Sequence, residues 1–183
     1  MKSAYKFIVA STLFISCFTI SAFAENNAAQ VTFSGKLIDE SCTVQGVSVP
    51  FGNVSLEPLK SHGQTTGQIP FQIVLQGCPT AENISIGLQG TTDNDAAETG
   101  TVLALTGEGA AKGVGIEVAE SDETGSQIKT QMNFSTVNYT APQQSDGTQP
   151  LTFYFNADLK SDPDVTLTAG VINASASINI KYE

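Results

Sequence analysis

The last stretch of the chain, Ala169 to Glu183, constrains the fold more than any other part of the sequence. Its apolar side chains recur at every second position, with polar side chains between them: Ile172, Ala174, Ala176, Ile178, Ile180 and Tyr182. This period is typical of a β-strand with one buried face. Only Glu183 follows, so we expect one edge of this strand to lack a partner. An apolar strand with an open edge tends to pair with another strand.

A second alternating stretch lies near the other end of the chain, within residues 25–38. Apolar or small side chains alternate there with polar ones, which predicts an extended arm: Ala29, Val31, Phe33, Gly35 and Leu37. Gly35 would suit a place that leaves no room for a side chain. The sequence therefore predicts an open strand edge near one end of the chain and, near the other end, an extended arm that could pair with such an edge.

Residues 1–24 have the pattern of a signal peptide. Lys2 and Lys6 give a positive start, an apolar core runs from Phe7 to Ile20, and small residues stand at Ala22 and Ala24. A membrane anchor is disfavoured because the apolar core falls short of the roughly 20 residues that a spanning helix needs. We expect cleavage before Glu25 and a product without a membrane anchor.

Removal of this leader, which contains Cys17, leaves Cys42 and Cys78. Two cysteines in an exported chain most simply form one disulfide. A zinc site is the alternative, but these cysteines lack both a CxxC spacing and nearby histidines. We therefore predict a structural Cys42–Cys78 bond.

The charge of the chain excludes some partners. The net charge is −10 at pH 7 and the sequence contains no arginine. Nucleic acids and anionic membranes are bound largely through lysine and arginine. We therefore expect neither as a partner.

The middle of the chain consists of short alternating runs separated by turns rich in Gly, Asn, Asp and Pro. Examples are Phe71 to Leu75, Ile84 to Leu88, Val114 to Val118 and Leu151 to Phe155. No stretch shows convincing helical spacing. This pattern predicts an all-β sandwich that forms a single domain.

The residues that catalysis would require are not grouped in the sequence. His62 is the only histidine and stands in a turn-like segment without a matching nucleophile motif. Asp93, Asp95 and Glu98 lack the glycine and terminal glutamate of a calcium loop. We expect no enzyme activity and no metal or cofactor.

Three motifs together resemble the structural subunits of chaperone-usher pili. Gly170 and the penultimate Tyr182 resemble the C-terminal signature of that family. The stretch VTFSGKLIDESC, residues 31–42, looks like its N-terminal extension running into the first cysteine. The stretch GQIPFQIVLQGC, residues 67–78, resembles the strand that ends at the partner cysteine.

The resemblance implies an incomplete immunoglobulin-like sandwich that lacks its seventh strand. Residues 1–24 would be the signal peptide, residues 25–38 a donor-strand extension and residues 39–183 the pilin domain. The donor side chains would be those of the arm, Ala29, Val31, Phe33, Gly35 and Leu37. The acceptor groove and chaperone contact would involve Gly170, Ile172, Ala174, Ala176, Ile178, Ile180, Tyr182 and Glu183.

The resemblance also implies the partners and the location of the protein. A periplasmic chaperone would first supply a strand to the groove. At an outer-membrane usher, the arm of a neighbouring subunit would replace that strand and extend a head-to-tail polymer. The product would be a cell-surface fimbrium that supports adhesion. Two alternatives remain at this point: an exported monomer whose arm fills its own groove, and a tip adhesin.

Overall fold

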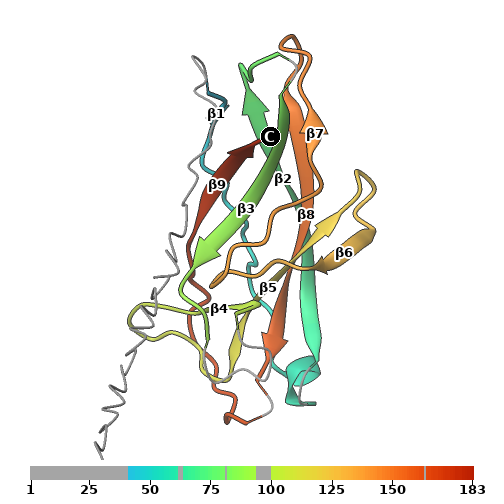
Figure 1. Cartoon of the computed structure of the whole chain (residues 1–183). Helices are drawn as coiled ribbons and strands as arrows, with labels where there is room; N and C mark the ends of the chain where they lie inside the picture. Colours follow the sequence, from blue (N-terminus) through green and yellow to red (C-terminus); the bar gives the residue numbers. More distant parts are fainter. Residues whose placement is uncertain (1–40, 62–63, 81, 94–99, 163) are drawn as a thin grey trace, which may run out of the picture. The chain divides into compact units, whose positions relative to one another are not determined.

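Two β-sheets face each other across a hydrophobic core in the computed structural model, which describes residues 41–61, 64–80, 82–93, 100–162 and 164–183 (Figure 1). The strands of the first sheet run in the order β1-β2-β8-β5-β4, and β6 pairs with β5. Their bounds are β1 (Thr43–Val44), β2 (Thr65–Gln76), β4 (Val102–Ala104), β5 (Val114–Ser121), β6 (Gln127–Gln131) and β8 (Leu151–Ser161). The second sheet has the order β7-β3-β9, formed by β7 (Gln143–Gln144), β3 (Asn83–Gly90) and β9 (Ala176–Tyr182).

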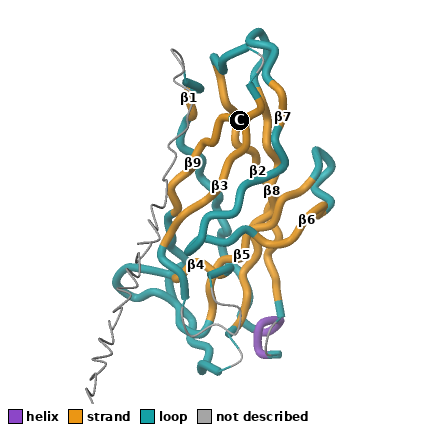
Figure 2. The backbone as a smooth tube through the Cα atoms, in the orientation of Figure 1, coloured by secondary structure: helices purple, strands orange, loops and turns teal. Residues whose placement is uncertain are grey.

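The strand pairings confirm the predicted all-β architecture, since every named pair is antiparallel. The described part of the chain contains one helical turn, the 3₁₀ segment η1 (Glu57–Lys60) (Figure 2). Pro58 favours the first turn of such a helix, and Leu59 is buried beneath it. No helix among the described residues is long and apolar enough to span a membrane.

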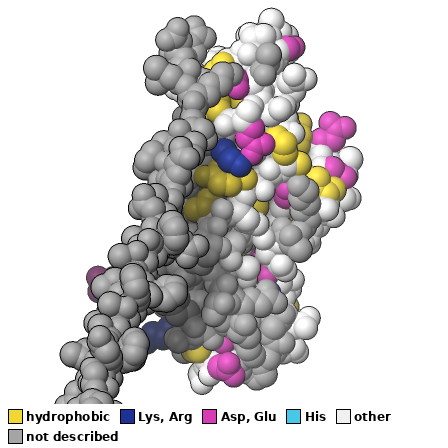
Figure 3. All heavy atoms as spheres, in the orientation of Figure 1, with side chains coloured by type: hydrophobic (Ala, Val, Ile, Leu, Met, Phe, Trp, Pro, Cys, Tyr) yellow, Lys and Arg dark blue, Asp and Glu magenta, His cyan; other side chains and the backbone are white. Residues whose placement is uncertain are grey.

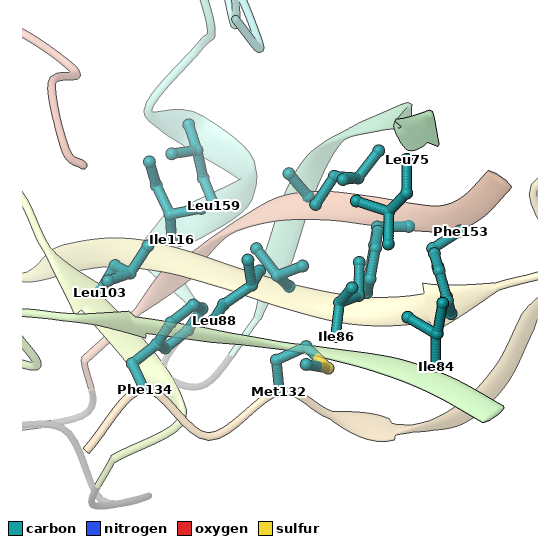
Figure 4. Packing of buried hydrophobic residues seen from close by; sticks show 14 of the residues in the cluster. Leu75, Ile84, Ile86, Leu88, Leu103, Ile116, Met132, Phe134, Phe153 and Leu159 are labelled. Atoms are coloured by element: carbon teal, nitrogen blue, oxygen red, sulfur yellow. The ribbon is translucent and has the colours of Figure 1, made fainter. Parts of the chain in front are cut away.

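The core follows from the alternation of the long strands. In the β2–β8 pair, Phe71 lies opposite Phe155 and Ile73 lies opposite Phe153, so these four side chains share one face. The rings of Phe71 and Phe155 stack with their centroids 5.4 Å apart. Side chains from both sheets and from the segment after β6 fill the space between the sheets, as Figure 4 shows: Leu75, Ile84, Ile86, Leu88, Leu103, Ile116, Met132, Phe134, Phe153 and Leu159.

The last strand is shorter than the sequence predicted. It begins at Ala176, not at Ala169, and pairs with β3 along its whole length. The preceding residues pair with the β4–β5 turn instead, because Val171 N–H donates to Gly109 O (2.8 Å) and Ala111 N–H donates to Val171 O (3.1 Å). A period of two predicts an extended chain, but it does not identify the hydrogen-bond partner.

Two further stretches alternate in the sequence, which predicts strands, but the structure does not contain strands there. Val47 to Phe51 belongs to no strand. Val137 to Tyr139 makes only an isolated bridge, in which Tyr139 lies opposite Gly87. Neither segment forms the continuous series of hydrogen bonds to an adjacent strand that defines a β-strand.

Candidate functional site

A disulfide joins Cys42 to Cys78, which confirms the predicted pairing. The two Cα atoms lie 4.2 Å apart, and both residues are buried. Cys42 immediately precedes β1, and Cys78 lies two residues after the end of β2, so the bond joins the chain at these two points. Closing a loop with a separation of 36 positions should stabilise the fold by about 4 kcal/mol in the chain-entropy model.

The C-terminal end of β9 meets this disulfide. The N–H of Cys42 donates a hydrogen bond to the hydroxyl oxygen of Tyr182, at 2.8 Å. Figure 1 shows the short strand β1 near the same end of β9. Two segments far apart in the sequence are thereby held together at this end of the sandwich.

Beyond this contact, the two segments separate and leave a cavity of about 550 Å³. Residues between Val44 and Phe51 line one side, and residues 174–178 line the other. The base consists of core side chains from both sheets: Phe71, Ile73, Leu88, Leu103, Ile116, Val118 and Ala157.

Two further cavities continue along the same path. One of about 750 Å³ lies between residues 47–54 and residues 170–174. Another of about 80 Å³ lies between residues 54–56 and residues 169–172, beside Leu59. Neighbouring cavities share lining residues, so we describe them together as the groove, with residues 44–56 and 169–178 as its two walls. None of its lining residues carries a charge.

The backbone beside the groove has free pairing capacity. Among the described strands, β9 pairs with β3 only, and residues 45–54 belong to no strand. Apolar side chains of both walls remain accessible: Val44 is 36% exposed, Val47 42% and Val171 55%. An unpaired strand edge above an apolar base is the geometry that accepts an added strand.

The structure places most of the predicted acceptor residues along this groove. Gly170, Ile172, Ala174, Ala176 and Ile178 line it. Ile180 and Tyr182 instead pack against the core beyond its closed end. The predicted donor residues Ala29, Val31, Phe33, Gly35 and Leu37 lie outside the described residues, as does His62.

A close backbone approach explains the glycine at position 170. A Cβ atom there would lie 2.4 Å from Ala111 N and 2.6 Å from Gly109 O. Gly170 therefore lets the wall of the groove lie directly against the β4–β5 turn. The sequence motif containing Gly170 indicated its importance but not this contact.

The sequence analysis missed the opposite wall of the groove. Val44, Val47, Val49 and Phe51 face β9 across the cavity of about 550 Å³. Their alternation with polar residues was visible, and it predicted a strand. What the pattern could not show is that residues 45–51 form no strand and make up one side of a groove.

The end of the chain carries a pair of opposite charges. Lys181 forms an ion pair with Glu183, and the Lys181 ammonium lies 5.6 Å from the centre of the Tyr139 ring. The hydrogen bond and charge of Glu183 raise the pKa of Lys181. The Glu183 N–H donates to Asn83 O at 2.8 Å, which fixes the backbone of the last residue.

On the face drawn in Figure 3, hydrophobic side chains reach the surface beside a basic side chain, and acidic side chains are spread around them.

No cluster that could hold a metal ion is found among the described residues. The arrangement is that of an apolar binding surface. It is suited to hold an extended polypeptide through its backbone and its alternate side chains.

Comparisons with known proteins agree with this geometry. The family model described as Fimbrial protein matches residues 31–183. Long polar fimbria protein A of Salmonella typhimurium is 29% identical over 100% of both chains. Fimbrial subunit type 1 of Salmonella typhimurium is 30% identical over 96% of this chain and 95% of its own.

The fold has solved counterparts as well. The crystal structure of the P pilus rod subunit PapA superposes with a TM-score of 0.60 and 19% identity, over 79% of this chain and 100% of that one. This similarity confirms the predicted immunoglobulin-like pilin fold. The chain belongs to the fimbrial protein family, as a structural subunit of the cell-surface fimbria and not an enzyme, and it shares its fold with subunits of chaperone-usher pili.

Proposed function

We propose that this subunit polymerises by donor-strand exchange, with the groove accepting residues 25–38 of a neighbouring copy. The observation that supports this most strongly is the groove itself, which combines the unpaired edge of β9 with an uncharged, apolar base. Donor-strand complementation of pilins is an established example of strand addition.

The arm has the composition that such a groove requires. Val31, Phe33 and Leu37 each contribute about 1.5 to 3 kcal/mol when fully buried. Each new main-chain hydrogen bond adds about 0.5 to 1.5 kcal/mol. Ordering the arm opposes part of this gain, but the sum favours a long-lived joint.

Before assembly, the same groove needs another occupant, because its apolar base would otherwise favour aggregation. A periplasmic chaperone supplies that strand and binds the carboxylate of Glu183 through basic side chains. At an outer-membrane usher, the arm of the next subunit replaces the chaperone strand. The resulting fibre supports adhesion of the cell.

Cysteine cross-linking tests the proposal and separates it from a self-filled monomer. Ala176→Cys on the groove wall is combined in one chain with Val31→Cys, Phe33→Cys or Leu37→Cys in the arm. Exchange predicts that at least one pair produces a ladder of covalent multimers on a denaturing gel. Thr32→Cys, on the other face of the arm, is the matched control and should cross-link poorly.

Cross-linked monomers without a ladder would show that the arm fills its own groove, and they would overturn exchange between copies. Subunits that cross-link in neither way would show that residues 25–38 are not the strand that occupies the groove.

A further inference from the structure

Among the described residues, the groove wall just before β9 is held by the β4–β5 turn, residues 105–113, and by no named strand. Five backbone hydrogen bonds join this turn to residues 168–173: Val171 N–H to Gly109 O (2.8 Å), Ala111 N–H to Val171 O (3.1 Å), Thr106 N–H to Asn173 O (2.8 Å), Thr168 N–H to Lys112 O (3.1 Å) and Lys112 N–H to Thr168 O (3.3 Å). Val171 thus bonds to the turn with both of its backbone groups.

The hydrogen bonds of β9 indicate which of its backbone groups point toward the groove. Asn83 and Glu183 exchange two bonds, at 3.2 and 2.8 Å. Bonded and non-bonded pairs alternate along an antiparallel ladder, so the next bonded pair is Ser85 with Lys181, and β9 bonds to β3 through its odd-numbered residues. Its even-numbered residues direct their N–H and C=O groups to the opposite edge, which borders the groove: Ala176, Ile178 and Ile180.

The segment held by the turn continues the same edge. Val171 bonds to the turn and Ser177 bonds to β3, and these two residues lie an even number of positions apart. In an extended chain, such residues point their backbone groups to the same side. Ile172 and Ala174, which line the groove, therefore direct their backbone groups toward it. Neither takes part in a backbone–backbone hydrogen bond with any of the described residues.

Two glycines give the β4–β5 turn its shape. Gly107 and Gly109 have φ of +102° and +73°, a region that glycine enters without strain. Neither glycine is among the described residues that line the groove. Their effect on the groove therefore passes through the wall that the turn holds.

We infer that the β4–β5 turn is a positioning element of the groove. By bonding to Val171 and Asn173, it holds Ile172 and Ala174 in line with β9, so that an incoming strand meets one continuous edge. A wall that the turn did not hold would have to become ordered when the strand arrives, and this ordering would lower affinity. The inference rests on the strand exchange proposed above, in which the incoming strand is residues 25–38 of a second copy.

Gly109→Val and Gly125→Val form a matched pair that tests the role of the turn. The φ of these glycines is +73° and +84°, and an added Cβ would meet nothing closer than 3.9 Å at either position. Valine should therefore strain either turn similarly and favour a loosened turn by about five- to thirty-fold. Of the two, Gly109 bonds to the groove wall, whereas Gly125 lies in the β5–β6 turn.

Amide hydrogen exchange, measured by NMR on the purified chain from Glu25 onward, reports how firmly the wall is held. In Gly109→Val, the N–H of Val171 should exchange about five- to thirty-fold faster than in the parent. In Gly125→Val, its rate should stay close to that of the parent. The N–H of Asn179, which bonds to β3, is the internal reference and should respond equally to both substitutions.

Uptake of a synthetic peptide with the sequence of residues 25–38 measures the consequence for the groove. Gly109→Val should bind this peptide about five- to thirty-fold more weakly than the parent, and Gly125→Val should bind it like the parent. A purely structural effect would follow the loss of unfolding stability and would appear in both variants. Gly109→Asn is the rescue, because asparagine tolerates a positive φ, and it should restore the affinity of the parent.

Unchanged exchange at Val171 in Gly109→Val would overturn the inference, and so would peptide binding that the two valine substitutions weaken equally or not at all. A parent chain that takes up no peptide would instead contradict strand exchange, and exchange at Val171 would then decide alone whether the turn holds the wall. If Gly109→Val does not fold, Gly109→Ala takes its place, with Gly125→Ala as its control.

Discussion

The backbone N–H of Cys42 and the hydroxyl of Tyr182 form a 2.8 Å hydrogen bond across 140 positions of sequence. Cys42 is bonded to Cys78, and Tyr182 is the last residue of β9. The contact therefore connects the two walls at the end where the groove closes.

Tyr182→Phe removes this hydrogen bond and keeps the ring. The free energy of unfolding should fall by about 0.5 to 1.5 kcal/mol, since one N–H loses its partner. The midpoint of denaturant unfolding measures the change, and its slope should stay constant. Tyr139→Phe, at an exposed tyrosine, is the control; an equal loss there would show that the Tyr182 hydroxyl has no special role.

Gly170→Ala should destabilise the subunit by about 1 to 3 kcal/mol, because the added Cβ would overlap the backbone at Gly109 and Ala111. Gly46→Ala is the matched control in the opposite wall, where a Cβ meets nothing within 4 Å. That substitution should be neutral or slightly stabilising. Thermal unfolding of both variants checks the difference, and equal melting temperatures would contradict this account of Gly170.

Under the proposed strand exchange, Gly35→Asn should leave a soluble, folded subunit that no longer polymerises, because the arm would then carry a side chain at the position expected to need none. Fibres counted by electron microscopy and multimers on a denaturing gel measure the effect. Thr32→Asn, on the opposite face of the arm, should polymerise normally. Normal fibres from Gly35→Asn would show that this position does not enter the groove.

The pKa of Asp158 predicts how the free energy of unfolding depends on pH. Burial, with a smaller effect from the negative charge of Glu117 directly opposite, raises the pKa of Asp158. Lys160 lies near both and forms an ion pair with Glu117 at 2.6 Å. Folding therefore favours the protonated form of Asp158. Its contribution to stability is greatest below the ordinary aspartate pKa of about 3.9 and is lost as pH rises through the raised pKa.

Asp158→Asn should remove this dependence. The variant should be more stable than the parent near pH 7, and the difference should shrink as the pH falls toward about 3. Free energies of unfolding measured across this range check the sign. Glu108→Gln removes an exposed negative charge elsewhere and should not reproduce the trend. A constant difference between Asp158→Asn and the parent at all pH values would contradict the assignment.

Local chemistry made much of the fold predictable. Ile178, Ile180 and Tyr182 alternate with polar residues, and this pattern alone identified a strand with one buried face. The predicted leader and the two cysteines outside it predicted the disulfide, since disulfides form in exported chains. Both inferences needed only neighbouring residues or a count of residues.

The features that required partners distant in sequence could not be read in this way. Val171 belongs to the same alternating run as β9, yet it pairs with the β4–β5 turn. Val47 and Phe51 alternate like a strand, yet they form an unpaired wall. The β5–β6 turn is held to β8 by a hydrogen bond from the Asn156 side chain to Gly125 O, 31 positions away.

The sequence alone predicted an exported, all-β, disulfide-linked subunit with an alternating apolar pattern near each end, because side-chain period and cysteine count are local properties. Only the tertiary structure decided which edges stay unpaired, where the groove opens and closes, and which side chains line it. Those outcomes depend on hydrogen bonds and packing between residues far apart in the chain, which no local pattern specifies.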